Sequence, residues 1–170
     1  MSRTPFSARP SRVVLALAAG TAMTAAVVTY AGAAPAPERA PAKAATTLNW
    51  IGVKKVDTEP RSARAGASWT TFLELHENNR GRPGKIIGDG SARCGTVRIT
   101  HNGSTTQCQR VLRTSKGFLA LSAMIDRFGG GPYKGASAVV GGTGSYAGAQ
   151  GEAEIVLDGK QVRFRIHLGG

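Results

Sequence analysis

Most of this chain alternates short strand-like runs with turn residues. From residue 48 onward, no stretch repeats apolar residues at the three-to-four-residue spacing of a helix over three turns. Instead there are about eight short runs typical of strands, separated by Asn, Asp, Gly and Pro. The runs are LNWIGVKKVD, SWTTFLELHE, GKIIGDGS with ARCGTVRIT, TTQCQRVLRT, GFLALSAMID, GASAVVG, GEAEIVLD and KQVRFRIHL. The pattern predicts an all-β domain.

The connections between these runs are short, which predicts antiparallel neighbours. Turn residues such as Asn102-Gly103 and Asp158-Gly159 support this arrangement. An open sheet would expose two strand edges, whereas closure into a barrel removes both and leaves a small interior that can hold an apolar ligand. We therefore expect an eight-stranded antiparallel up-and-down β-barrel, with a two-sheet sandwich as the alternative.

The last two runs predict a hairpin in detail. If Asp158-Gly159 is a two-residue turn, apolar side chains face each other on one side of the hairpin. Opposite charges then face each other on the other side, so that both faces agree with one register. This interpretation makes Arg163 and Arg165 part of a solvated, salt-bridged outer face. The expected pairs are Ile155–Val162, Ala153–Phe164, Glu154–Arg163 and Glu152–Arg165.

The N-terminus has the organisation of a secretory signal. Residues 1–12 contain three arginines and no acid, and an apolar, Ala-rich run follows over 13–34. Ala31-Gly32-Ala33 fits the small-x-small pattern of a cleavage site. We expect a signal peptide over 1–33, an Ala/Pro-rich linker over 34–47, and one domain over 48–170 of a secreted protein. A retained membrane anchor is the alternative, because the apolar run is long enough to span a bilayer.

The chain is basic, with 22 Lys and Arg against 10 Asp and Glu. Loss of the three signal arginines would leave 19 basic residues. This charge either draws the protein to anionic wall polymers or, as we favour, only keeps it soluble. The basic residues are scattered along the chain, however, and no nucleic-acid-binding module is recognisable. We expect no specific nucleic-acid partner, and no membrane association once the signal is removed.

Cys94 and Cys108 are the only cysteines, and an even pair in an exported chain suggests one disulfide. A two-residue turn at Asn102-Gly103 would place Cys108 opposite Val97, too far from Cys94. Three alternatives remain: a longer loop, which we favour, a bulge near Gly95, or separate thiols. No metal site is expected, because there is no C-x-x-C pair and the histidines are far apart in sequence.

The string Gly142-Thr143-Gly144-Ser145-Tyr146-Ala147 has the G-x-G-x-x-A form of a dinucleotide-binding loop. Such a loop needs a helix directly after the glycines, whose N-terminus binds the phosphate. Here Gly148-Ala149-Gln150-Gly151 is a poor helix start and leads into a strand-like run. We therefore interpret the string as a bend between two strands, in which glycine permits tight turns and close backbone approach.

The same segment resembles the G-G-T-G-x-[FY]-x-x-A-x-G motif of the allene oxide cyclase barrel and dirigent family. Two further segments are similar to that family: Gly84-Lys85-Ile86-Ile87-Gly88 followed by Cys94, and the closing VRFRIHL. The resemblance covers roughly residues 48–170. The residues that match the motif are Gly141, Gly142, Thr143, Gly144, Tyr146, Ala149 and Gly151.

This resemblance implies an eight-stranded barrel with an apolar cavity, often assembled into homodimers or homotrimers. Related members cyclise or isomerise a reactive substrate without a cofactor, by holding it in one conformation. Plant cyclases place a Glu and an Asn on their first strand, where this chain has Lys55 and Asp57, so allene oxide cyclase activity itself is not predicted. Asp57 stands in for the first-strand Asp of dirigent proteins, or else is a surface residue beside Pro60.

Further candidates come from strand faces. Glu74 and His76 share one face of the second run. They would supply a catalytic acid and a hydrogen-bond donor if that face lines the cavity, and the alternative is a solvated outer face. Ser122 and Met124 share a face of the fifth run, as ligand-binding or plain core residues. Tyr133 and Tyr146 lie near loops and are placed at the barrel mouth, with Tyr146 also packing within the glycine segment.

The leading hypothesis is a secreted barrel that binds a hydrophobic small molecule and directs its cyclisation or isomerisation. The alternatives are a carrier barrel without catalysis and an extracellular protein that binds anionic wall polymers. An ionisable side chain in the cavity favours the first, and an all-apolar cavity the second. A filled barrel with a one-sided basic patch favours the third.

Overall fold

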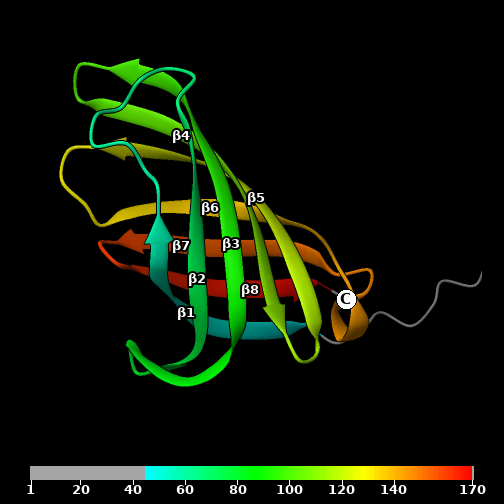
Figure 1. Cartoon of the computed structure of the whole chain (residues 1–170). Coiled ribbons are helices and arrows are strands. Elements are labelled where there is room, and N and C mark those ends of the chain that lie inside the picture. The colour runs from blue at the N-terminus through cyan, green and yellow to red at the C-terminus, as the bar shows by residue number, and fades with distance from the viewer. Residues whose placement is uncertain (1–44, 170) are drawn as a thin grey trace, which may run out of the picture. The chain divides into compact units, whose positions relative to one another are not determined.

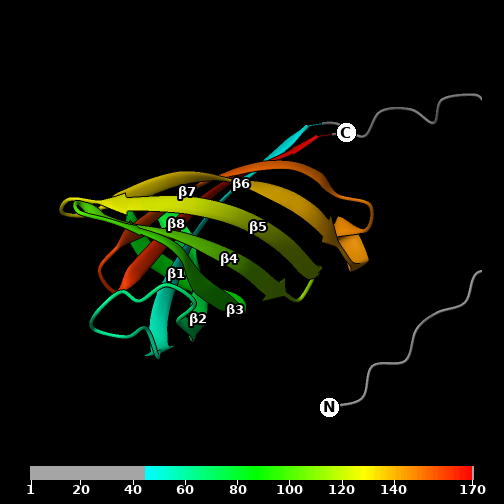
Figure 2. The same ribbon diagram turned by 90° about the horizontal axis from the view of Figure 1, so that it is seen from above.

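The computed structural model describes residues 45–169, which form the closed eight-stranded antiparallel β-barrel expected from the sequence (Figures 1 and 2). Each strand pairs with the next along the chain, and β1 pairs with β8 to close the barrel. The strands are β1 (Thr46–Asp57), β2 (Ser68–Asn79), β3 (Arg82–Thr100), β4 (Gly103–Thr114), β5 (Gly117–Phe128), β6 (Tyr133–Gly142), β7 (Gln150–Asp158) and β8 (Gln161–Gly169).

The N-terminal predictions fall almost entirely outside these residues. The signal peptide over 1–33 and the linker up to residue 44 lie outside the described part of the chain. The end of the expected linker is corrected, because Thr46 and Thr47 already pair with β8. Within residues 45–169, no helix is long and apolar enough to cross a membrane.

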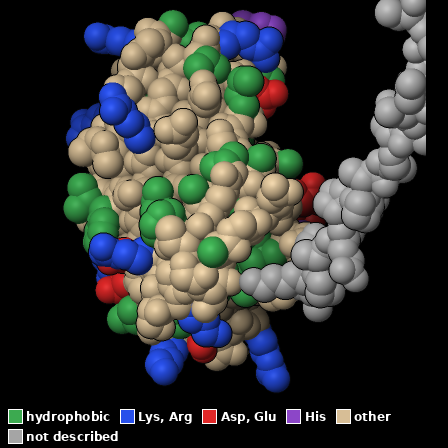
Figure 3. Space-filling model, turned by 90° about the vertical axis from the view of Figure 1, so that its right-hand side faces the viewer, with side chains coloured by type: hydrophobic (Ala, Val, Ile, Leu, Met, Phe, Trp, Pro, Cys, Tyr) green, Lys and Arg blue, Asp and Glu red, His purple; other side chains and the backbone are tan. Residues whose placement is uncertain are grey.

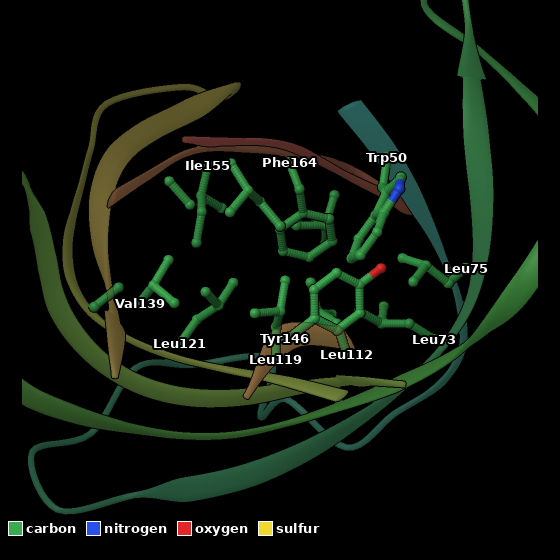
Figure 4. Close-up of a cluster of buried hydrophobic side chains, with 14 of the residues drawn as sticks. Trp50, Leu73, Leu75, Leu112, Leu119, Leu121, Val139, Tyr146, Ile155 and Phe164 are labelled. Carbon is green, nitrogen blue, oxygen red and sulfur yellow. The ribbon is translucent and has the colours of Figure 1, made fainter. Parts of the chain in front are cut away.

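Alternation of side chains along each strand builds the core. In β7, Ala153 and Ile155 are buried while Glu152 and Glu154 are exposed, as the period of two requires. Buried side chains of β1, β2, β4 to β8 and η1 (Gly144–Tyr146) meet inside the barrel (Figure 4). The cluster comprises Trp50, Leu73, Leu75, Leu112, Leu119, Leu121, Ala123, Ile125, Val139, Tyr146, Ala153, Ile155, Val162, Phe164 and Ile166.

The β7–β8 hairpin confirms the predicted faces and corrects the predicted partners. Asp158 pairs with Gln161, so the turn is Gly159-Lys160 and the register is shifted by two residues from the expected one. Gly159 has a φ of +55°, and a hairpin turn with positive φ at its first central position favours Gly there. A two-residue shift leaves every side chain on its face. The pairs are therefore Ile155–Phe164, Ala153–Ile166, Glu154–Arg165 and Glu152–His167.

Cys94 and Cys108 lie directly opposite each other and form a disulfide with a Cα–Cα distance of 4.1 Å. The expected longer loop is wrong: Thr100 pairs with Gly103, so the turn has only two residues. The register shifts between Thr96 and Arg98, which is the bulge alternative, placed close to Gly95. The turn is His101-Asn102, one residue before the expected Asn102-Gly103. Together with the bulge, this position places Cys94 opposite Cys108.

Removal of this disulfide is expected to cost about 3 kcal/mol of unfolding free energy, because the bond closes a short loop in the unfolded chain. The two sulfurs are 14 residues apart in sequence. Urea unfolding of the Cys94→Ala/Cys108→Ala double variant, compared with the oxidised wild type, measures the loss. A difference below about 1 kcal/mol would contradict the loop-closure argument.

The glycine segment crosses one end of the barrel between β6 and β7. The glycines lead into a single 3-10 turn, η1 (Gly144–Tyr146), and not into a helix long enough to bind a nucleotide phosphate. The backbone N–H of Thr143 donates to the carbonyl of Phe118 (2.9 Å), and that of Ser145 donates to Lys116 (2.8 Å). These bonds hold the segment against the β4–β5 turn and direct the Tyr146 side chain into the core.

Candidate functional site

Cavities lie at both ends of the barrel, on either side of the apolar cluster. At the η1 end, an open cleft of about 540 Å³ lies between the starts of β1 and β3, the ends of β2 and β4, and η1. We call it the aromatic cleft, because Trp50 and Tyr146 form its inner wall. The remaining lining residues are Leu48, Glu77, Lys85, Ile86, Ile87, Thr114, Ser115 and Lys116.

The two rings of the aromatic cleft meet edge to face. Their centroids are 6.2 Å apart and their planes make an angle of 74°, an arrangement favoured by the aromatic quadrupole. Both residues are 7% exposed, and Figure 4 shows the two side chains converging from different parts of the chain. Within residues 45–169, neither the Tyr146 hydroxyl nor the Trp50 indole N–H has a hydrogen-bond partner. Both polar groups are therefore available to a ligand.

The rim of the aromatic cleft is charged, and its interior is apolar. Lys85 and Lys116 stand on the rim with a single carboxylate, Glu77. Figure 3, which views the molecule from the η1 side, shows hydrophobic side chains toward the middle of this face and Lys and Arg mainly around its edge. An apolar ligand body with a neutral or acidic substituent would match this distribution.

At the opposite end, a small chamber of about 30 Å³ lies inside the barrel beside the disulfide. We call it the cationic chamber, because Lys54, Arg110 and Arg127 all line it. An outer vestibule of about 180 Å³ shares Glu59, Trp69 and Arg127 with the chamber. The ion pair between Arg127 and Glu59 therefore stands between the chamber and the vestibule.

Asp57 lies beside the cationic chamber, within a hydrogen-bond network. Its carboxylate accepts hydrogen bonds from Lys54 Nζ (2.7 Å), the Thr71 hydroxyl (3.1 Å) and the backbone N–H of Glu59 (3.2 Å). Burial raises the pKa of Asp57, but these bonds and the Lys54 charge outweigh it, so that the net pKa is lowered. Asp57 is an anion at neutral pH, which suits it to holding Lys54 and not to donating a proton.

Glu74 and His76 lie on the face of β2 opposite the core, so the outer-face alternative holds and they do not line the cavity. They alternate with Leu73 and Leu75, which are buried in the core. Lys55 Nζ is 2.9 Å from the Glu74 carboxylate, and its hydrogen bond lowers the pKa of Glu74. The ring nitrogens of His76 lie 3.0 Å from Glu74 and 2.9 Å from the carbonyl of Gly84. His76 is only 9% exposed, but its partners lie on the side of the strand away from the core, so the pair does not reach a ligand inside the barrel.

Ser122 and Met124 also lie on the outer face, which corrects their expected ligand-binding role. In β5 the buried residues are Leu121, Ala123 and Ile125. Met124 is 64% exposed, and Ser122 is between two buried positions of the strand. Both faces of this strand are largely apolar, so composition alone does not distinguish the inner one.

Tyr133 lies at a barrel mouth, as expected, and lines the outer vestibule. The Arg127 guanidinium stands 5.2 Å from the centre of its ring, within the range of a cation–π contact. The hydroxyl of Tyr133 donates a hydrogen bond to the carbonyl of Gly129 (3.0 Å). Tyr146 lies at the other mouth, so the two tyrosines are at opposite ends of the barrel.

Sequence reasoning missed the residues that define both cavities, above all Trp50, Lys54, Arg110 and Arg127. A signal for Arg110 was present. On the inner face of β4, Thr106, Cys108 and Leu112 alternate with outward residues, and Arg110 falls on the same inner face. An arginine in register with core positions predicts a buried charge.

The metal-ligating residue types do not gather into a site: the part of the chain that the structure describes has no cluster of three or more His, Cys, Asp or Glu able to hold a metal ion.

No protein-family model and no curated protein matches the sequence. A solved structure of a protein named "Pyocyanin demethylase" is similar, with a TM-score of 0.60 and 16% sequence identity. The match covers 72% of this chain and 99% of that chain. At this level of identity the likeness is one of fold.

Proposed function

We propose that the protein is a secreted barrel that binds a hydrophobic small molecule in the aromatic cleft. The observation that carries this proposal is a cleft of about 540 Å³ whose inner wall is the Trp50–Tyr146 pair. Small-molecule sites commonly have volumes of about 300 to 1,000 Å³ and combine apolar walls with a few polar groups. The free indole N–H and phenol hydroxyl supply such groups.

The chemistry of the lining defines the ligand class. Trp50, Tyr146 and the partly buried Leu48 and Ile87 present apolar surface to the ligand. Each Å² of apolar surface that leaves water contributes about 25 cal/mol, so a flat or aromatic body gains most here. Lys85 and Lys116 at the rim favour an acidic substituent over a basic one.

The arrangement of the aromatic cleft supports ligand binding better than it supports catalysis on the bound ligand. The resemblance to the allene oxide cyclase and dirigent family suggests cofactor-free cyclisation or isomerisation, which orientation in a closed site promotes. The candidate acids do not serve this cleft: Asp57 lies at the other end of the barrel, and Glu74 lies outside. A carrier or sequestering role therefore fits the arrangement more closely. The Cys94–Cys108 disulfide is consistent with an extracellular location.

A neutral fluorescent probe, N-phenyl-1-naphthylamine, tests the proposal. The full chain is expected to bind it saturably, with energy transfer from Trp50, which lines the cleft. Trp69 lines the cavities at the other end. The chain has only these two tryptophans, so Trp50→Phe should abolish most of the transfer and Trp69→Phe should preserve it. Absence of saturable binding by the wild type would overturn the proposal.

A matched pair of charge insertions locates the probe. Ile86 is 56% exposed and lines the cleft, so Ile86→Arg is expected to fold and to weaken probe binding about tenfold by placing a charge against the apolar body. Met124 is 64% exposed on the outer face of β5, so Met124→Arg should leave the affinity unchanged. Equal losses in both variants would mean that the probe binds the general surface.

A further inference from the structure

Arg110 is a cation placed in the middle of the barrel. It lies on the inner face of β4 between Cys108 and Leu112, and it is only 3% exposed. Its neighbours across the sheet, Ala92 and Leu121, are buried as well. Arg110 therefore separates the apolar cluster from the cationic chamber, and its side chain lines that chamber.

The guanidinium of Arg110 has no partner among residues 45–169. Its Nη1 is fully buried without a hydrogen bond, and no carboxylate forms an ion pair with it. The two neighbouring cations are already satisfied, since Lys54 pairs with Asp57 and Arg127 pairs with Glu59. Buried charges in proteins are almost always paired. The chamber thus has an unbalanced positive charge at its inner wall.

Arg110 remains charged at neutral pH. Burial and the nearby Arg127 charge lower its pKa to about 10. This value is still well above 7, so the group does not escape its unfavourable setting by losing the proton. A bound anion would remove the imbalance, since it supplies both the missing charge and the missing hydrogen-bond acceptors.

The size of the chamber limits which anion can enter. Its volume is about 30 Å³, which is small for a polyatomic anion and favours a flat carboxylate over a tetrahedral phosphate or sulfate. A planar carboxylate also matches the fork of an arginine, which can donate two parallel hydrogen bonds.

The vestibule supplies room for the rest of such a molecule. It has a volume of about 180 Å³ and is lined by Trp69, Tyr133 and Arg127. Its floor is the Arg127–Glu59 pair, whose side chains are 19% and 27% exposed and so border solvent. A carboxylate entering from the vestibule would displace Glu59 from Arg127 and place itself between Arg127 and Arg110.

We propose that the cationic chamber is a second ligand site, which binds the carboxylate of a small organic acid between Arg110 and Arg127. The acid's carbon skeleton lies in the vestibule against Trp69 and Tyr133. Glu59 forms an ion pair with Arg127 when no ligand is present and competes with the incoming carboxylate for it. This site is at the opposite end of the barrel from the aromatic cleft and does not depend on the function proposed there.

The test titrates the full chain with sodium acetate and sodium benzoate, and follows the thermal unfolding midpoint and the fluorescence of Trp69 in the Trp50→Phe chain. Sodium chloride balances the ionic strength throughout. Both carboxylates are expected to raise the midpoint saturably, with benzoate binding more tightly because its ring fills the vestibule. Chloride, phosphate or sulfate that matches acetate at equal ionic strength would overturn the proposal, because the effect would then be general screening.

Three variants locate the carboxylate. Arg110→Met keeps a long side chain in the core and should weaken benzoate binding at least tenfold, roughly the loss of one charge-assisted contact. Glu59→Gln, near the surface, should strengthen binding about threefold or more, because it frees Arg127. Arg93→Met removes the same charge from an exposed position on β3 and should change the affinity less than twofold. Unchanged binding in both Arg110→Met and Glu59→Gln would overturn the proposal.

Discussion

Replacing Gly151 by alanine is expected to cost about 4 kcal/mol of unfolding free energy, a large loss for a single methyl group. Gly151 has a φ of +142°, and a Cβ on it would lie 2.0 Å from the carbonyl oxygen of His167. That oxygen belongs to the backbone of β8, which pairs with β7 at this point. The methyl group can be accommodated only if the two strands move apart.

Gly141 provides a matched control within the same glycine segment. Its φ is +152°, but a Cβ there would meet nothing within 4 Å. Gly141→Ala should therefore cost only the backbone strain, about 1 to 2 kcal/mol. Urea unfolding of both variants separates the cost of backbone strain from the cost of the steric clash with β8. Equal losses would mean that close approach of β8 is not the reason for glycine at residue 151.

Tyr146→Ala is expected to cost about 3 to 4 kcal/mol, because it removes a buried ring from the end of the core. Tyr146 is 7% exposed and packs edge to face on Trp50. The same change removes one wall of the aromatic cleft, so it should also weaken N-phenyl-1-naphthylamine binding about tenfold in the folded protein. Urea unfolding and probe titration measure the two effects separately.

Tyr146→Phe is the control for this prediction. The hydroxyl has no hydrogen-bond partner within residues 45–169, so its removal should change stability by less than about 1 kcal/mol. The ring remains, and probe affinity should stay within about threefold of the wild type. If Tyr146→Ala bound the probe as tightly as Tyr146→Phe, the aromatic wall would have no part in the site.

The β7–β8 hairpin shows that a local sequence pattern predicts the faces of a strand but not its register. Alternation of apolar and charged residues correctly predicted which side chains of β7 and β8 face the core. It did not predict their partners, because a slip of two residues leaves every side chain on the same face. The turn decided the register: Gly159 has a positive φ and Lys160 does not, which is the pattern of a two-residue turn with glycine first.

The candidate site residues show a second limit of sequence patterns, which is the choice between the inner and the outer face of a strand. Residues such as Glu74 and His76 were correctly grouped on one face of their strand, yet the face proved to be the outer one. In β5, Leu121 and Met124 differ little in hydrophobicity, although one is buried and the other is 64% exposed. Where both faces of a strand carry apolar residues, period-two alternation identifies the two faces but does not say which one the closed barrel encloses.

The sequence by itself determined the all-β class, the positions of the strands and the bend at the glycine segment, because strand period and turn chemistry are properties of neighbouring residues. Only the tertiary structure decided what the barrel encloses. Closure brings Glu59 to Arg127, 68 residues away, and brings Trp50 against Tyr146. It also leaves Arg110 buried near the Glu59–Arg127 pair, without a counterion among residues 45–169. These contacts join residues far apart in the chain, so they exist only once β8 has paired with β1.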